Sequence, residues 1–131
     1  MKDKDPFEYF YNLQELKEVV CVSNEGFCEA ILLKFVGGEC LIKVCSDTDE
    51  LTVEMGGSFL LEQGQIYSLT LTNPWVNCIG QSLLWAWLLR NQQGYTDAIQ
   101  FQFHNHITLQ LVSIGSELKL SEVGFYQKLF S

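Results

Sequence analysis

Residues 28–46 carry the most regular alternation of apolar and polar positions, in two runs that flank Gly37 and Gly38. A glycine pair suits the positive φ angles of a two-residue hairpin turn. Closing the hairpin there brings apolar side chains opposite one another, in the pairs Phe35–Cys40, Leu33–Ile42 and Ile31–Val44. One face of the hairpin is then wholly apolar, and we expect that face to be buried.

Alternation also predicts strands over residues 51–55, 66–72 and 98–103. Residues 83–89 form an uninterrupted apolar run, which fits either a buried helix or a buried strand. We favour the strand because residues 98–103 supply an antiparallel partner, through a connection centred on Gly94. Further turns are expected at residues 104–106 and at Gly115.

The N-terminal region shows a different spacing. Asp5 precedes Pro6, a combination typical of a helix N-cap followed by a proline in the first turn. Apolar residues then recur every three positions, at Phe10, Leu13 and Leu16. This spacing predicts a helix from Pro6 to Glu18, which hands over to a strand in the β-branched residues that follow.

A chain of 131 residues is the usual size of one domain, so we assign residues 1–131 to a single domain. The predicted class is α+β and mainly β. In this fold the N-terminal helix packs on a twisted, predominantly antiparallel sheet of about six to eight short strands, either open or curled toward a barrel.

The charge balance narrows the choice of partners. A formal net charge of −8 repels nucleic-acid phosphates and anionic lipids, so we expect neither a nucleic acid nor a membrane as partner. The charged N-terminus is followed by no long apolar segment, and we expect no signal peptide and a cytoplasmic location. Five cysteines, an odd number without a Cys-x-x-Cys motif, are then expected to be reduced thiols.

The sequence contains few groups of residues that could form a metal site or a catalytic site. His104 and His106 would share one face of a continuous strand, but two ligands do not make a metal site, and a solvent-facing turn is favoured. An acidic cluster at Asp47 and Asp49 lacks the later ligands of a calcium loop. The sequence contains no glycine-rich phosphate loop and no recognisable nucleophile motif. We therefore predict no catalytic residue, cofactor or metal.

The most distinctive segment runs from Trp85 to Asp97, with the sequence WAWLLRNQQGYTD. It resembles a W-x-W-x-L-x-N-Q-Q-G-Y-x-D-like segment of a small bacterial family of unknown function, and the resemblance implies no activity. At least one of Trp85 and Trp87 is expected to be buried. The polar residues after them form a candidate contact surface: Asn91, Gln92, Gln93, Tyr95 and Asp97. The competing interpretation is that these groups brace their own loop.

The sequence is compatible with two functions from different classes. The first is a non-enzymatic protein-interaction module with an acidic surface, directed at a protein partner. The alternative is a small-molecule-binding or hydrolytic domain with an aromatic-lined pocket. Candidate pocket residues are Trp85, Trp87, Tyr95, His104 and His106. The sequence leaves the oligomeric state open.

Overall fold

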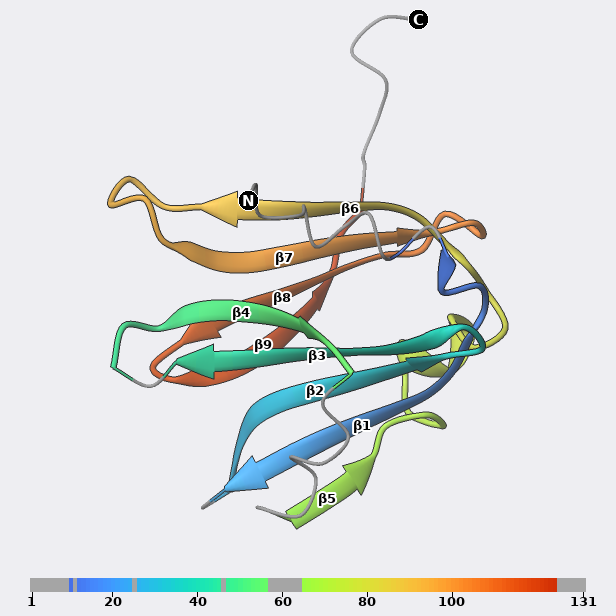
Figure 1. The fold of residues 1–131 in the computed structure, drawn as a ribbon, viewed down its shortest axis with the longest axis horizontal. Coiled ribbons are helices and arrows are strands. Elements are labelled where there is room, and N and C mark those ends of the chain that lie inside the picture. The colour runs from blue at the N-terminus through green and yellow to red at the C-terminus, as the bar shows by residue number, and fades with distance from the viewer. Residues whose placement is uncertain (1–9, 11, 25, 46, 57–64, 125–131) are drawn as a thin grey trace, which may run out of the picture.

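Figure 1 shows the computed structural model of the chain, which describes Phe10 and residues 12–24, 26–45, 47–56 and 65–124. The described chain forms two antiparallel sheets. The first has the strand order β4-β3-β2-β1-β5 and consists of β1 (Leu16–Asn24), β2 (Phe27–Phe35), β3 (Gly38–Cys45), β4 (Glu50–Met55) and β5 (Gln65–Ser68). The second has the order β6-β7-β8-β9 and consists of β6 (Leu83–Arg90), β7 (Thr96–Phe103), β8 (Thr108–Ile114) and β9 (Glu117–Glu122).

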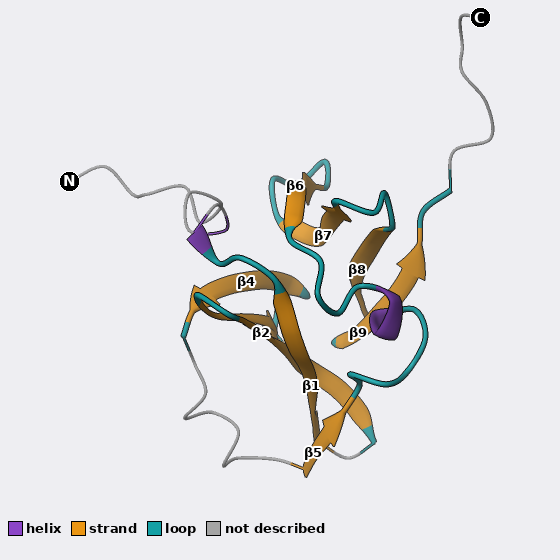
Figure 2. Cartoon of the chain, turned by 90° about the vertical axis from the view of Figure 1, so that its right-hand side faces the viewer, coloured by secondary structure: helices purple, strands orange, loops and turns teal. Residues whose placement is uncertain are grey.

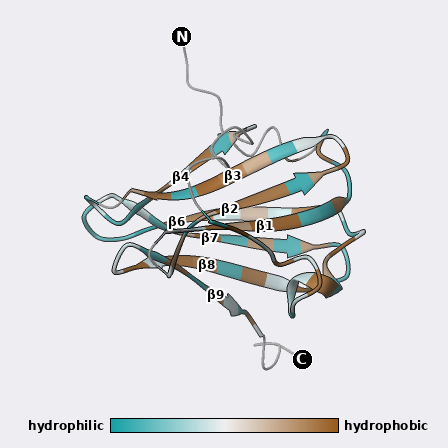
Figure 3. Ribbon diagram, turned by 90° about the horizontal axis from the view of Figure 1, so that it is seen from below, coloured by the Kyte–Doolittle hydropathy of each residue, from teal (hydrophilic) through white to brown (hydrophobic). Residues whose placement is uncertain are grey.

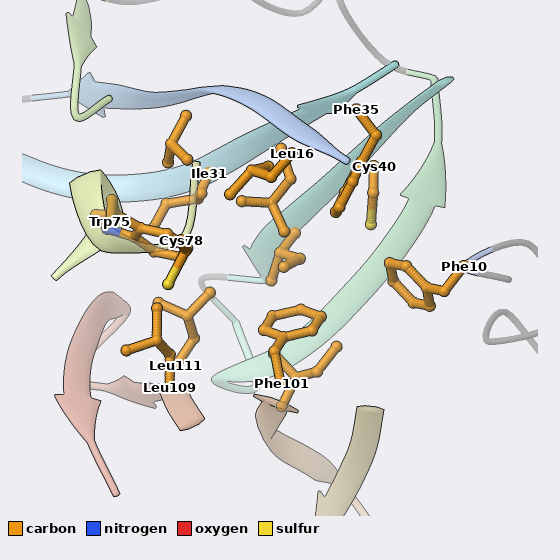
Figure 4. Close-up of a cluster of buried hydrophobic side chains, with 14 of the residues drawn as sticks. Phe10, Leu16, Ile31, Phe35, Cys40, Trp75, Cys78, Phe101, Leu109 and Leu111 are labelled. Atoms are coloured by element: carbon orange, nitrogen blue, oxygen red, sulfur yellow. The ribbon is translucent and has the colours of Figure 1, made fainter. Parts of the chain in front are cut away.

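The core lies between the two sheets. Apolar and polar segments alternate along the strands in Figure 3, so each strand can turn one apolar face inward. The inward side chains meet in a single cluster, drawn in Figure 4, in which Leu33, Ile42, Phe101 and Leu111 are fully buried. The opposite face of the first sheet carries a second, smaller buried cluster of Val20, Val22, Ala30, Leu32 and Leu41.

A short 3-10 helix, η3 (Trp75–Asn77), packs against the core between β5 and β6 in the chain. Its Trp75 is only 1% exposed. Figure 2 shows η3 beside β9, and residues next to Trp75 share a surface hollow with the end of that strand. This connection therefore helps to close the space between the two sheets.

The predicted N-terminal helix is wrong, and so is the α+β class that depended on it. Of the described residues, 64% lie in strands and 5% are helical, so the described structure is mainly β. Strand β1 begins at Leu16, and Phe10 and Asn12 lie in a short 3-10 turn. The proposed cap at Asp5 and Pro6 lies outside the described residues.

A register shift in β1 continues the spacing by three from Leu16 to Val19, whereas Phe10 and Leu13 reach the inner cluster from the segment before β1. The pairing with β2 slips between Leu16 and Glu18, which leaves one extra residue in β1. Leu16 and Val19 therefore both reach the inner cluster although they are three positions apart. Spacing by three is the signature of a helix, and here a bulged strand reproduces it.

The barrel alternative is also wrong, because the strands form two separate sheets and no closed barrel. The strand over residues 83–89 is confirmed as β6, with β7 as its antiparallel partner, but the expectation that this strand is buried is wrong, because every residue of β6 is at least partly exposed. Gly94 lies in the connection between them with a φ of 86°. The turns predicted at residues 104–106 and at Gly115 are also found.

The hairpin of β2 and β3 forms, but its predicted register is offset by two residues. Leu33 pairs with Cys40, and Ile31 pairs with Ile42, around a turn at Val36 and Gly37. An offset of two keeps every side chain on the predicted face, because side chains alternate with a period of two. The predicted burial of Ile31, Leu33, Phe35, Ile42 and Val44 is therefore confirmed.

Neither Gly37 nor Gly38 has a positive φ angle, so the backbone conformation of the turn does not require glycine. Close packing explains the glycine pair instead. The Gly37 N–H donates a hydrogen bond of 2.8 Å to the Leu13 carbonyl oxygen. A Cβ atom added at Gly37 would collide with the Asn12 carbonyl oxygen. The segment before β1 therefore lies directly against this turn, where only glycine fits.

Asp49, in the turn between β3 and β4, joins the two sheets. Its Oδ1 accepts hydrogen bonds from the Ser113 hydroxyl and from the Ser116 N–H. Ser113 belongs to β8 and Ser116 lies in the turn before β9. The acidic turn seen in the sequence is thus a structural contact between the ends of the two sheets.

Replacing Gly37 by alanine is expected to lower the free energy of unfolding by about 1–3 kcal/mol, because the new methyl group must push the Asn12 backbone aside. Gly124 is the matched control, since a Cβ atom there meets nothing within 4 Å. Urea denaturation of Gly37→Ala and Gly124→Ala measures both changes. Equal stability of the two variants would contradict the close-packing explanation.

Candidate binding face on the second sheet

Strand β6 directs two indole rings away from the core. Trp85 and Trp87 are 53% and 40% exposed. The inward positions of the same strand are taken by Leu83, Ala86 and Leu88, which pack against the inner cluster. The expectation that one of these two tryptophans is buried is wrong, because alternation along β6 places both on the outer face.

Amide side chains continue this outer face across the sheet. Trp87 pairs with Gln100 of β7, which pairs with Gln110 of β8. Trp85 pairs with Gln102. Residues directly opposite in antiparallel strands present their side chains on the same face. We name these five residues, Trp85, Trp87, Gln100, Gln102 and Gln110, the indole–amide face.

None of the three glutamines of this face is among the contact or pocket residues predicted from the sequence. Their polar positions within residues 98–111 helped to predict strands, but nothing local indicates that they lie beside Trp85 and Trp87. The pairing of β6, β7 and β8 brings them together. The available signal was the repeated occurrence of glutamine at alternate positions, at Gln100, Gln102 and Gln110.

Among the described strands, β6 is also one of the two edges of the second sheet. Within the described part of the chain, its only partner strand is β7. Natural proteins commonly protect edge strands with charged side chains or by keeping them short. Strand β4 carries Glu50 and Glu54, β9 carries charges at three of its six positions, and β5 has four residues. In contrast, the eight residues of β6 contain no charge before Arg90.

The loop between β6 and β7 divides the predicted contact residues into two groups. The Asn91 side-chain oxygen accepts hydrogen bonds from the Gln93 and Tyr95 N–H groups, at 2.9 and 3.2 Å. Its side-chain nitrogen lies 3.4 Å from an Asp97 carboxylate oxygen. Asn91 and Asp97 therefore brace the loop. The side chains of Gln92, Gln93 and Tyr95 are exposed at its tip.

The predicted pocket residues are not gathered in one place. Tyr95 precedes β7 and His104 follows it, so the eight-residue strand, roughly 25 Å long, separates them. His104 and His106 are exposed in the β7–β8 turn. Among the described residues, no group of three or more His, Cys, Asp or Glu side chains could hold a metal ion.

Two surface hollows lie elsewhere. One, of about 440 Å³, is lined by residues of the η3 region and the end of β9, among them Asn77 and Glu122. The other, of about 360 Å³, surrounds the Gly37–Gly38 turn. Neither is lined by Trp85, Trp87 or a histidine.

A model of a family of unknown function (DUF6334) matches residues 1–127. The chain belongs to this family. This agrees with the resemblance to a small family of unknown function, and the family carries no assigned activity. No curated protein and no solved structure matches the chain. In the part of the chain that the structure describes, no helix has the length and apolar character needed to cross a membrane.

The three tryptophans should differ in their effect on stability. Trp75→Ala removes a buried ring from the core and is expected to lower the free energy of unfolding by about 3–5 kcal/mol. Trp87→Ala removes a partly exposed ring and should cost about 1–2 kcal/mol. Chemical denaturation compares the two variants, and equal losses would show that Trp87 is a core residue in solution.

The loop residues Asn91 and Gln92 provide a second comparison. Asn91→Ala leaves the Gln93 and Tyr95 N–H groups without their side-chain acceptor and is expected to cost about 1–2 kcal/mol. Gln92→Ala should cost less than about 0.5 kcal/mol, because its side chain is exposed. Thermal and urea unfolding test this order of stability. A Gln92→Ala variant as unstable as Asn91→Ala would make the whole loop a structural brace.

Proposed function

We propose that this protein is a non-enzymatic interaction module that binds an extended segment of a protein partner along β6. The observation that carries the proposal is the combination of features on one strand. Strand β6 is an edge, has no charge before Arg90, and bears two partly exposed indole rings. An exposed edge of this kind is a template for another strand.

Backbone hydrogen bonds to the outer edge of β6 would provide the affinity. Alternate side chains of the bound segment would then lie beside Trp85 and Trp87, where large aromatic surfaces supply contact area at a low entropic cost. The amides of Gln100 and Gln102 offer donors and acceptors to polar groups of the same segment. The exposed Gln92, Gln93 and Tyr95 extend the contact surface at one end of β6.

The proposed interface is uncharged, so the acidic net charge of the chain does not call for a basic partner segment there. The acidic residues of the hairpin between β3 and β4 lie on the first sheet, and the indole–amide face contains none. We therefore propose a segment rich in apolar and uncharged polar residues rather than a basic one. Its binding should depend only weakly on salt, because few charges are brought together. We further propose that this binding takes place in the cytoplasm, with the cysteines reduced.

Selection of peptides from a displayed random library against the full chain tests the proposal. Selected peptides should bind wild-type protein with an affinity that changes less than about threefold between low and high salt. Methylating the alternate backbone nitrogens that face β6 should abolish binding, because those groups can no longer donate hydrogen bonds to β6, whereas methylating the other alternate set should not. Trp87→Ala should weaken binding at least tenfold, as expected for an aromatic anchor, about 1.4 kcal/mol or more.

Tyr67→Ala is the matched control, because Tyr67 is a 50% exposed aromatic on β5, an edge strand of the other sheet. It should bind the selected peptides as the wild type does. Hydrogen exchange should show slower exchange of β6 amides when peptide is added. Strong protection of all β6 amides in the free protein, or equal losses in Trp87→Ala and Tyr67→Ala, would reject this binding mode.

A further inference from the structure

Two cysteines face each other near the turn between β1 and β2. The sulfur atoms of Cys21 and Cys28 are 2.7 Å apart. All five cysteines lie in described residues, and the structure holds them as free thiols. The two sulfurs are thus separated by only about 0.7 Å more than the length of a disulfide bond, which is about 2.0 Å.

A register shift brings this pair together. Regular pairing continues from Cys21↔Ile31 to Val22↔Ala30, and the next pair is Ser23↔Cys28. One residue of β2 is therefore skipped. Without the shift, Cys28 would point to the same face as Ala30, because the two residues are two positions apart. Instead, Cys28 packs against the inner cluster, on the face of Cys21 and Ile31.

The surroundings of Cys21 shift its pKa in the opposite direction from the pKa values of the buried thiols Cys40 and Cys78. Burial raises the pKa of Cys40 and of Cys78 to about 12, which leaves both thiols protonated and unreactive. The hydrogen bond with Cys28 acts in the opposite direction on Cys21 and lowers its pKa. The same hydrogen bond, together with burial, raises the pKa of Cys28. Of the two thiols, Cys21 therefore loses its proton more readily and Cys28 less readily.

We propose that Cys21 and Cys28 form a reversible, peroxide-sensitive dithiol that closes to a disulfide within the β1–β2 hairpin. The Cys21 thiolate attacks one oxygen of hydrogen peroxide, the O–O bond breaks, and the released hydroxide takes up a proton to become water. Cys21 is then a sulfenic acid. The Cys28 sulfur attacks the Cys21 sulfur, and the hydroxyl group leaves as a second water with the Cys28 proton. Two thiols are oxidised, and one peroxide is reduced to two waters.

The position of the pair allows a small oxidant to reach it. Cys21 is 7% exposed, and Cys28 is more accessible. The hairpin turn beside them is exposed at Gly26 and Phe27. Disulfides of cytosolic proteins are commonly transient and redox-sensing, so this reaction is compatible with the proposed cytoplasmic location. It does not depend on peptide binding at β6, which belongs to the other sheet.

Treatment of the folded full chain with hydrogen peroxide tests the proposal. Thiol labelling after unfolding should show that free thiols fall from the five of the reduced chain by two. Intact mass should fall by two hydrogen atoms in a monomeric product, and non-reducing peptide mapping should find Cys21 linked to Cys28. Dithiothreitol should restore all the thiols. In denaturant the preference for this pair should disappear, because the folded hairpin creates it.

Cys45→Ser is the matched control, since Cys45 is the exposed cysteine on β3. This variant should form the Cys21–Cys28 link at the wild-type rate. Cys28→Ser should form no intramolecular disulfide and should accumulate Cys21 sulfenic acid, which a dimedone probe traps. Persistence of all five thiols in the folded wild type, or oxidation of Cys40 or Cys78 as fast as the pair, would overturn the proposal. The wild-type mapping decides the question even if a serine variant fails to fold.

Discussion

Burial of two apolar sheet faces against each other is the interaction on which the rest of this structure depends. Each strand can turn only alternate side chains inward, so the core requires apolar residues at a period of two. The inward residues of β2, β3, β7 and β8 meet this requirement, and many of them are fully buried. Phe10 joins them from outside the sheets. The centroid of its ring lies 5.9 Å from the centroid of the Phe101 ring, in an edge-to-face contact.

Register shifts modify this period at a few positions, and they have large consequences. The shift after Leu16 lets two inward residues of β1 lie three positions apart, and the shift after Val22 turns Cys28 toward Cys21. A further shift follows Leu83 at the start of β6. Bulges of this kind redirect side chains without breaking the sheet. The proposed redox pair therefore exists because one residue of β2 is skipped.

The second sheet combines a structural face and an exposed face in the same strands. Phe101 and Phe103 of β7 are fully buried, while Gln100 and Gln102, which alternate with them, lie beside the indoles of β6. Packing on the inner face holds the outer face in a fixed register. The indole–amide face is thus preorganised, which reduces the entropic cost of binding a partner. The braced loop after β6 extends this rigidity through Asn91 and Asp97.

The sequence by itself determined the strands over residues 51–55 and 98–103, the inward faces of the β2–β3 hairpin, and the turns at Gly94 and Gly115, because these features depend on neighbouring residues. The strand predicted over residues 66–72 is shorter in the structure, where β5 ends at Ser68. Only the tertiary structure decided what depends on distant partners. The contact with Asn12 explains Gly37, and the pairing of β6 with β7 exposes Trp85 and Trp87 while Trp75 is buried. The meeting of Cys21 with Cys28 likewise required the register between strands, which a period of two leaves undetermined.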